Sequence, residues 1–335
     1  MVRLAVDAMS GDEGPLATLP AAVSALESHS DLEIVLVGQA EGIKAALGQM
    51  HPRLFIDDTP DVVRMDELPT HALRHGKNTS MWRAIELVAS GQAAACVSAG
   101  NTGALMAMSR HLLKTLPGID RPAICASLPT SSGSTYMLDL GANVSASSEQ
   151  LLQFALMGAA MVETLDGKNL PTVGLLNIGS ESTKGHDTLH QAARLIRDNG
   201  LNYSGFVEGT DLYTGNTDVI VTDGFTGNVA LKASEGMAQF VIQRFKDSFK
   251  HSWRTKLAGL LAMPELKHSM KNIDPRHYNG ASLLGLRGLV VKSHGNADYY
   301  AFNRALMLAR REASRSLCSR LESALEPLID QEGSD

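Results

Sequence analysis

The chain has 335 residues, enough for one extended α/β domain or for two lobes. A formal net charge of −6 and an aromatic content of 5% argue against general nucleic-acid binding and against an aromatic platform for bases. No run approaches the ~18 apolar residues that a membrane span needs, and the chain begins on a strand pattern without an apolar leader. We therefore expect a cytoplasmic protein, or at most a peripheral one.

Short apolar runs that end in Gly, Asp or Ser alternate with longer helical patterns along the chain. The patterns predict helices over residues 15–29, 81–91, 104–116, 147–165 and 186–200. Between them they predict a strand over residues 32–38 and strands that run into loops over residues 3–12, 94–103, 134–143, 172–180 and 217–228.

Strands as uniformly apolar as these suit a largely parallel sheet with helices on both faces, so the predicted fold is α/β, in three layers. Cys96 and Cys125 lie in apolar runs and are predicted to be buried strand residues. Together with Cys318 they are too far apart in the sequence to suggest a disulfide framework or a structural zinc site.

Glycines and small polar residues gather where strands are predicted to end, in "DAMSGD", "SAGNTG", "NIGSESTKG" and "TDGFTGN". In sheets of this kind ligands bind at the carboxyl ends of strands, where helix N-termini offer free N–H groups. The four junctions are expected to converge on one anion-binding cleft, provided that the sheet brings them together. The third is not a nucleotide-binding P-loop, because Lys184 precedes Gly185 instead of following a glycine.

These junctions resemble those of the PlsX phosphate acyltransferases of bacterial phospholipid synthesis. The matching segments follow the family's order over nearly the whole chain: "DAMSGD", "SAGNTGA", "LLNIGSESTKG", "FVEGTD", "DVIVTDGFTGNVALK" and "YNGASLLGLRGLVVKSHG". One departure is Ser10, where the family usually has glycine, and this side chain is expected to limit how closely the backbone approaches a ligand. The segment from Tyr278 departs slightly from the usual "YGGAPLLGL".

The resemblance implies transfer of a long-chain acyl group from acyl-[acyl-carrier protein] to inorganic phosphate, giving acyl phosphate. It implies an architecture similar to the phosphate acetyltransferases and the isocitrate dehydrogenase superfamily, as a homodimer without metal or other cofactor. It also implies peripheral attachment to the membrane, where the product passes to a membrane glycerol-phosphate acyltransferase. Residues 1–335 are expected to form one catalytic unit, or two lobes made of residues 1–145 with 290–335 and of residues 146–289.

The residues fit that chemistry, because phosphate is itself the nucleophile and a thiol leaves readily, so catalysis can rest on positioning and electrostatics. No G-x-S-x-G elbow and no Cys/His pair is recognisable. The residues predicted to act in catalysis are Lys184, Asn228 and His294. Those predicted to bind substrate or phosphate are Asp7, Gly11, Asp12, Ser98, Asn101, Thr102, Gly179, Glu181, Ser182, Gly185, Asp223 and Gly227.

Each of these residues also has a plain structural interpretation. Lys184 can be a solvated loop lysine, and Asn101 and Asn228 can be helix N-caps or turn residues. His294 can be a turn histidine bonded to backbone, and the carboxylates can fix loops by accepting backbone N–H bonds. His186 and His190 have the spacing of metal ligands but lack the intervening Glu, so they are interpreted as helix-surface residues.

Residues 239–271 form a basic amphipathic segment, with seven Lys or Arg against two acidic residues. Such a helix can lie in a membrane interface or attract an acidic carrier protein. The alternative is an apolar stripe packed on the core or on a dimer partner, which is favoured up to Trp253. The residues predicted to contact membrane or carrier protein are Lys250, Trp253, Arg254, Lys256, Leu257, Leu260 and Leu261.

Two other functions remain open. One is a short-chain phosphate acetyltransferase that uses coenzyme A thioesters, although such an enzyme needs no basic amphipathic surface. The other is a non-catalytic, membrane-recruited scaffold that binds carrier protein, in which the glycine-rich loops are structural.

Overall fold

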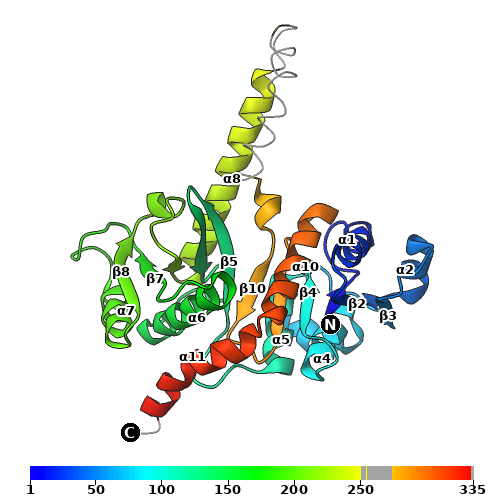
Figure 1. Cartoon of the computed structure of the whole chain (residues 1–335), viewed down its shortest axis with the longest axis horizontal. Coiled ribbons are helices and arrows are strands. Elements are labelled where there is room, and N and C mark those ends of the chain that lie inside the picture. The colour runs from blue at the N-terminus through cyan, green and yellow to red at the C-terminus, as the bar shows by residue number, and fades with distance from the viewer. Residues whose placement is uncertain (250–253, 255–273, 333–335) are drawn as a thin grey trace.

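The computed structural model describes residues 1–249, 254 and 274–332. Their helices lie on both sides of one sheet, and a single long helix projects from the body (Figure 1). The strands are β1 Val2–Asp7, β2 Leu32–Gly38, β3 Leu54–Asp58, β4 Ala95–Ser98, β5 Ala123–Thr130, β6 Gly133–Leu138, β7 Thr172–Leu176, β8 Asn202–Val207, β9 Val219–Val221, β10 Ala281–Leu284 and β11 Leu289–Lys292. The α-helices are α1 Pro15–Ser28, α2 Ala40–Leu47, α3 Pro69–His75, α4 Ser80–Ala89, α5 Thr102–Leu113, α6 Ser148–Asp166, α7 Asp187–Asp198, α8 Gly224–Ser248, α10 Tyr299–Ser314 and α11 Leu317–Glu332. Short 3-10 turns lie at Gly76–Asn78, Gly209–Asp211 and Pro275–Tyr278.

The eleven strands form one sheet in the order β3-β2-β1-β4-β11-β10-β5-β6-β9-β7-β8. Its two outer parts are parallel, β3-β2-β1-β4-β11 on one side and β6-β9-β7-β8 on the other. Antiparallel pairings of β10 with β11 and with β5, and of β5 with β6, join them. The two parallel parts therefore run in opposite directions.

Side chains alternate across the inner strands and feed two separate apolar cores. On β1, for example, Leu4 and Val6 belong to the core beneath α1, α6, α7, α10 and α11, whereas Ala5 belongs to the core beneath α3, α4 and α5. The same alternation holds on β4, β6, β9 and β11, so both cores run across the whole sheet. This confirms the predicted three-layer α/β fold with a largely parallel sheet. Cys96 and Cys125 are buried strand residues, as predicted.

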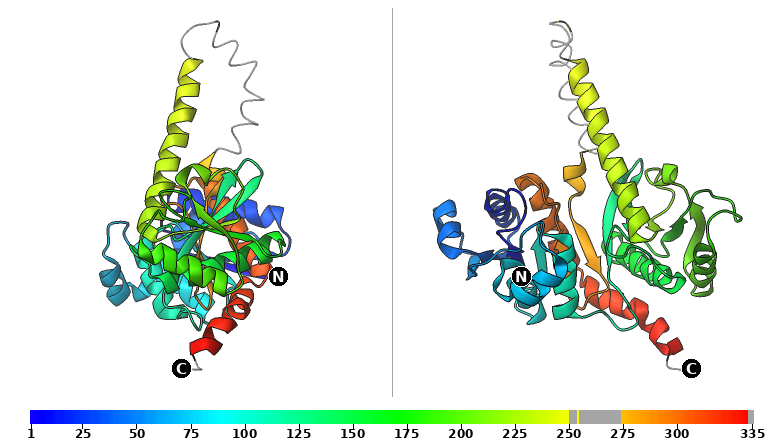
Figure 2. Two further views of the ribbon diagram at one scale, coloured as in Figure 1. Left: turned by 90° about the vertical axis from the view of Figure 1, so that its left-hand side faces the viewer. Right: turned by 180° about the vertical axis from the view of Figure 1, so that it is seen from behind.

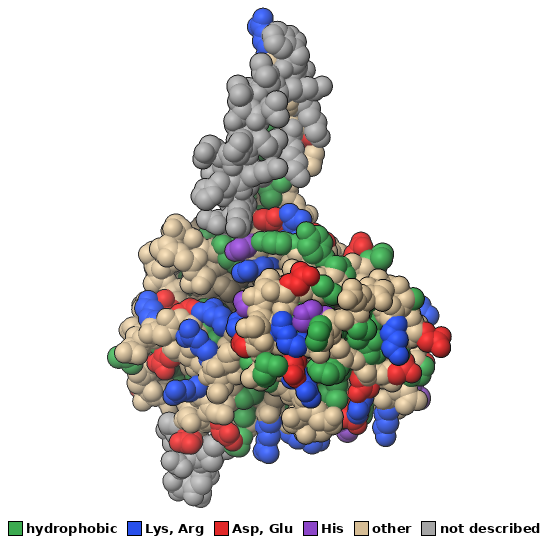
Figure 3. All heavy atoms as spheres, turned by 45° about the vertical axis from the view of Figure 1, so that its right-hand side comes forward, with side chains coloured by type: hydrophobic (Ala, Val, Ile, Leu, Met, Phe, Trp, Pro, Cys, Tyr) green, Lys and Arg blue, Asp and Glu red, His purple; other side chains and the backbone are tan. Residues whose placement is uncertain are grey.

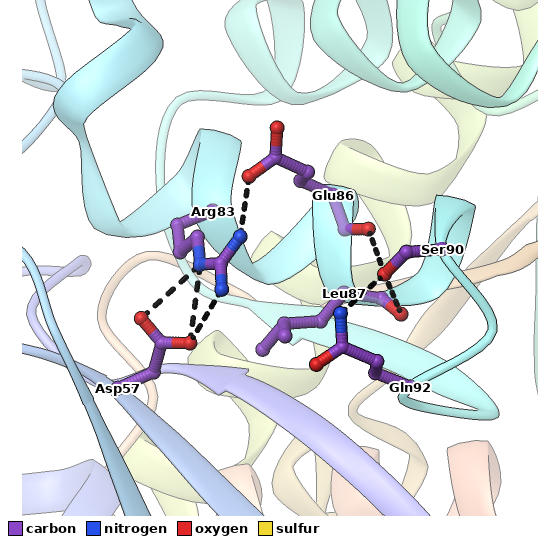
Figure 4. Close-up of polar contacts among 6 residues, drawn as sticks. All are labelled: Asp57, Arg83, Glu86, Leu87, Ser90 and Gln92. Carbon is purple, nitrogen blue, oxygen red and sulfur yellow. Dashed lines mark hydrogen bonds and ion pairs between the residues drawn. The ribbon is translucent and has the colours of Figure 1, made fainter.

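Helix α4 is held to the outer edge of the sheet by an ion-pair network (Figure 4). The Arg83 guanidinium binds Asp57 of β3 at 3.0 Å and Glu86 of its own helix at 2.6 Å. Both carboxylates raise the pKa of Arg83 above its ordinary value. The network matters for function because Ser80, the first residue of α4, reaches the buried end of β1.

The two halves of the sheet share helices from the C-terminal part of the chain. Helix α10 packs against α1, β1, β4 and β11, whereas α11 packs against α6 on the other half. The chain after residue 314 thus crosses over to the half that the sequence assigned to residues 146–289. The division into lobes stays a prediction. Helix α11, which was expected to lie with residues 1–145, packs against α6 of the other half.

Helix α8 begins in the body and carries its outer turns away from it (Figure 2). Its helical conformation over Gln239–Ser248 agrees with the sequence pattern. The expected packing of its apolar stripe on the core is wrong for this part, since Phe240 is 60% and Phe245 51% exposed. On the face shown in Figure 3, acidic and basic side chains are mixed over the body, and apolar ones lie uncovered near the foot of the projection. Packing on a dimer partner stays a prediction.

Candidate active site

Asp7, the last residue of β1, is the centre of a buried polar cluster. Its carboxylate accepts hydrogen bonds from the hydroxyls of Ser80 (2.6 Å), Ser98 (2.7 Å) and Ser10 (2.5 Å). All four residues are buried. We call Asp7, Ser10, Ser80 and Ser98, together with Lys292, the Asp7 cluster. It gathers the carboxyl ends of β1, β4 and β11 and the N-terminus of α4, because these neighbouring strands are parallel.

The loops that follow β1, β4 and β11 touch one another. The Asp12 N–H donates to the Gly295 carbonyl oxygen at 2.8 Å. Gly11 has φ +96°, and a Cβ there would lie 2.9 Å from the Ala99 Cβ, so both conformation and space require glycine. The structure thus brings together Asp7, Gly11, Asp12 and Ser98, which the sequence had placed in separate motifs.

Ser10, which replaces the family's usual glycine, turns inward. Its hydroxyl donates to Asp7, and the residue is 3% exposed. The side chain also lies against Gly100, where an added Cβ would be 3.0 Å from the Ser10 Oγ. The expectation that Ser10 keeps a ligand away from the backbone is therefore not supported, because the substitution adds a hydrogen bond to the buried carboxylate instead.

Lys292 is the residue that the sequence analysis missed. It ends β11 opposite Ser98 of β4, and its ammonium donates to the carbonyl oxygens of Ala99 (3.4 Å) and Ser293. Burial lowers the pKa of Lys292 to about 8, against the opposing attraction of Asp7 and Asp12. One signal could have found it: in "GLVVKSHG" a lysine directly continues an apolar strand, where charge is costly.

The neighbouring predicted residues have largely structural contacts. Asn101 is the N-cap of α5, where its Oδ1 accepts from the Ala104 N–H and its Nδ2 donates to the carbonyl oxygens of Met65 and Glu67. Thr102 is exposed in the first turn of α5.

His294, in the loop after β11, is exposed. Its backbone N–H donates to Asn279, and its Nδ1 accepts from the Asn296 N–H at 3.4 Å.

The loop between β7 and α7, residues 177–186, is the second group. We call it the Lys184 loop. Asn177 fastens it, because its Nδ2 donates to the Lys184 carbonyl oxygen at 3.1 Å and its Oδ1 accepts from the Ile178 N–H at 2.8 Å. Gly185 has φ +89° and lies against the same amide. Glu181, Ser182 and Lys184 are all exposed, and Gly179 lies beneath Glu181 and Lys184.

The start of α8 is packed closely on the end of β6. Asp223 is its N-cap and accepts from the N–H and hydroxyl of Thr226, both at 2.8 Å. A Cβ at Gly227 would lie 1.9 Å from the Asp139 carbonyl oxygen, and Asn228 lies beside Gly141. Asn228 is partly exposed, one turn into the helix.

Asp139, another residue that the sequence analysis passed over, organises this second region. Its Oδ1 accepts from the N–H groups of Ile124 (2.9 Å) and Ala142 (3.0 Å), and its Oδ2 from the N–H of Asn143 (2.7 Å). Burial raises the pKa of Asp139, while these donors counter the shift. Its role is to hold a loop, which matches the structural interpretation given above for strand-end carboxylates.

The four glycine-rich junctions thus form two groups. Those after β1 and β4 meet the end of β11, and those after β7 and β9 lie on adjacent strands of the other half. The hydrogen bonds described above are internal to each group. Because the two parallel parts of the sheet run in opposite directions, convergence on one cleft stays a prediction.

A surface depression of about 500 Å³ adjoins the Lys184 loop, lined by Ser182, Asp187, His190, Gln191 and Arg194. His190 packs edge-to-face on Phe206, with ring centroids 5.5 Å apart, which agrees with its interpretation as a helix-surface residue. His186 is the N-cap residue of α7. Within the described ranges, no group of three or more His, Cys, Asp or Glu is placed to hold a metal ion.

Most of the segment predicted to contact membrane or carrier protein lies outside the described residues, namely Lys250, Trp253, Lys256, Leu257, Leu260 and Leu261. Arg254 is described and exposed. Among the helices of the described part, none is both long enough and apolar enough to cross a bilayer.

Comparison with known proteins gives the family. Residues 2–320 match the model of a family described as "Fatty acid synthesis protein". A phosphate acyltransferase of Alkalilimnicola ehrlichii is 50% identical over 98% of this chain and 97% of its own, and one of Alcanivorax borkumensis is 51% identical over 97% and 98%. One of Legionella pneumophila is 48% identical over 98% of both.

Solved structures agree at the level of the fold. A phosphotransacetylase from Streptococcus pyogenes superposes with a TM-score of 0.62 at 16% identity, over 93% of this chain and 94% of that one. A branched-chain phosphotransacylase from Enterococcus faecalis gives 0.61 at 13% identity, over 93% and 99%. With relatives about half identical over nearly its full length, the chain belongs to the phosphate acyltransferase (PlsX) family of acyltransferase enzymes.

Proposed function

We propose that this acyltransferase moves a long-chain acyl group from acyl-[acyl-carrier protein] to inorganic phosphate, and that the acyl phosphate feeds phospholipid synthesis. Family membership supports acyl transfer involving phosphate. The carrier-bound substrate and the membrane destination of the product are the finer parts of the proposal.

The environment of the candidate nucleophiles supports direct attack by phosphate. Burial raises the pKa of the Cys96, Cys125 and Cys318 thiols, which keeps them from forming the thiolate that a covalent acyl-enzyme would need. The buried serine hydroxyls of the Asp7 cluster are tied to one carboxylate. Phosphate needs no such intermediate, so the protein can act by holding the two reactants together.

Lys184, Asn228 and His294 are proposed as the side chains that meet the reacting groups. Lys184 is an exposed cation on a loop fixed by Asn177, His294 is exposed beside the Asp7 cluster, and Asn228 stands at the start of α8. A flexible ammonium suits phosphate as a point charge, and an amide can donate to a developing oxyanion. The other predicted residues would shape the loops around them.

Sheet twist supports a reaction between the two groups. From β4 to β9 the sheet takes five steps, and a twist of about 20–25° per step turns the strands by about 100–125°. Strands that are formally opposed then have carboxyl ends only about 55–80° apart in direction. Reaction between a thioester held by one group and phosphate held by the other is part of the proposal.

The observation that carries the choice of substrate is the uncovered outer part of α8. Phe240 and Phe245 are exposed there, in a segment where basic residues outnumber acidic ones. Short-chain transfer from coenzyme A requires no such surface, whereas an acidic carrier protein or an anionic membrane would be attracted to it. A homodimer and transfer of the product to a membrane glycerol-phosphate acyltransferase are part of the same proposal.

The test is thiol release from long-chain acyl-carrier protein with and without inorganic phosphate, with hydroxylamine present to trap acyl phosphate. We expect release that depends on phosphate and a trapped hydroxamate. Release from acetyl-coenzyme A alone would replace the proposal by the short-chain activity. Release from neither substrate would favour the scaffold.

A further inference from the structure

The ammonium of Lys292 has negative charges nearby but no direct ion-pair partner among the described residues. It has hydrogen bonds to two backbone carbonyl oxygens, and within the described part of the chain it forms no ion pair. An ammonium has three N–H donors, so one remains for another partner. A buried cation normally has an opposite charge beside it, because desolvating an isolated charge is costly.

Asp7 attracts the ammonium but forms no ion pair with it. Its carboxylate oxygens are already bound by the hydroxyls of Ser10, Ser80 and Ser98, which fix its orientation. Asp12 lies near enough to attract the ammonium but is exposed to solvent. Two backbone carbonyl oxygens therefore hold Lys292, and the Asp7 charge attracts it without direct contact.

The surroundings suit a small anion. The loops at the strand ends are made of small residues here: Gly11, Ala99 and Gly295 lie close together, and a Cβ at Gly11 would lie 3.1 Å from the Gly295 carbonyl oxygen. Helix α5, which follows β4, begins here and is twelve residues long, so its positive end adds to the cation. The reaction of this family supplies one small anion, phosphate.

We infer that Lys292 binds the phosphate that attacks the acyl group, with the Asp7 carboxylate, held by its three serines, as the nearby charge that attracts the ammonium. This rests on the proposed function for the identity of the anion. It adds a cation from the opposite half of the sheet to the exposed Lys184. Only the protonated form of Lys292 can do this, so affinity for phosphate should fall as pH rises past about 8.

The experiment compares the wild-type protein with Lys292→Met and Lys292→Arg, and with Lys44→Met, which removes an exposed lysine of α2 as the matched control. Two quantities are measured: the rise in melting temperature on adding inorganic phosphate to a phosphate-free buffer, at constant ionic strength with chloride, and the KM for phosphate. The first needs no acyl substrate, so it stays informative even if the proposed carrier-protein substrate is wrong.

We expect Lys292→Met to lose the phosphate-dependent rise and to increase the KM for phosphate at least tenfold, with Lys44→Met unchanged. Lys292→Arg stays charged, so its KM for phosphate should not increase between about pH 7.5 and about pH 9 as that of the wild-type protein does. Phosphate titrates in the same way in both assays, so its own titration cancels when the two proteins are compared. The pH dependence of Lys292→Arg tests the inference if Lys292→Met does not fold. A Lys292→Met protein with the full phosphate-dependent rise, or a Lys292→Arg protein with the wild-type pH dependence, would overturn the inference.

Discussion

The Asp7 cluster and the Lys184 loop are built in opposite ways. The cluster is assembled from four places in the sequence and is largely buried, and its central carboxylate accepts hydrogen bonds from three hydroxyls. The loop is one continuous stretch in which Glu181, Ser182 and Lys184 are exposed, and its backbone is held by hydrogen bonds from Asn177 and to Glu208. Both carry a lysine: Lys292 ends β11, whereas Lys184 lies in the loop that follows β7.

This difference decides how each lysine can work. Lys292 cannot move far, and burial alters its proton affinity, whereas Lys184 keeps the mobility of a surface side chain. The first suits a fixed binding position, and the second suits a group that approaches a bound ligand. The predictions that follow separate the two roles.

The largest effect is expected for Asp7→Ala. The change strands three buried hydroxyls and removes the support of Lys292, so the free energy of unfolding should fall by about 3 kcal/mol or more. Turnover should fall at least a hundredfold. Urea unfolding and the thiol-release assay measure both quantities. If Asp7→Ala unfolds at the wild-type urea concentration, the cluster does not stabilise the fold.

Lys184→Ala should be the next in size, with turnover lowered at least tenfold and stability unchanged, because the side chain is exposed and only the backbone of Lys184 fastens the loop. Turnover is followed by phosphate-dependent thiol release, and the fold by circular dichroism and melting. Normal turnover in a folded variant would remove Lys184 from the mechanism and leave Lys292 as the cation of interest.

Asp12→Asn should shift a pH profile without abolishing activity. The Asp12 carboxylate raises the pKa of Lys292, so its loss should lower that pKa below about 8 and make phosphate binding weaken at a lower pH. The pH dependence of the KM for phosphate measures this. Glu13→Gln is the matched control, since Glu13 is the exposed neighbour. Equal profiles for the two variants would mean that Asp12 is not coupled to Lys292.

The smallest effect is expected for Asp223→Ala, at the start of α8. It removes an exposed N-cap, which costs about 1 kcal/mol, against the larger loss predicted for the buried Asp7. Urea unfolding of both variants under one condition gives the comparison. A loss as large as that of Asp7→Ala would show that burial is not what distinguishes the two carboxylates.

Apolar periodicity was enough to predict most elements near the ligand-binding ends of the sheet. The strand before Asp7, the strand before Asn101 and the helix after His186 are where the pattern placed them. The sheet order could not be predicted in the same way. Strands β10 and β5 are short apolar runs like the others, and nothing local shows that they pair antiparallel in the middle of the sheet.

The candidate site was predictable where its signal is local. Glycine-rich junctions reveal the Lys184 loop and the turns around Gly11, because backbone conformation there requires glycine. Ser80 gave no such signal, since its importance arises from the distant residue that it meets, and the only local sign of Lys292 is its place at the end of an apolar strand. Asn101 illustrates the converse: its motif suggested a ligand, but the amide is used as a helix cap.

The two apolar cores described above extend under both halves of the sheet, and this bears on how the molecule comes apart. Leu4 of β1 and Val173 of β7 belong to the same core, as do Ala5 and Ile220 on the opposite face. Cleaving the chain between the halves would expose buried side chains of β10 and β5 to water. The molecule should therefore unfold as one cooperative unit on heating or in denaturant. A substitution that destabilises the Asp7 cluster or the Lys184 loop should then lower the stability of the whole molecule.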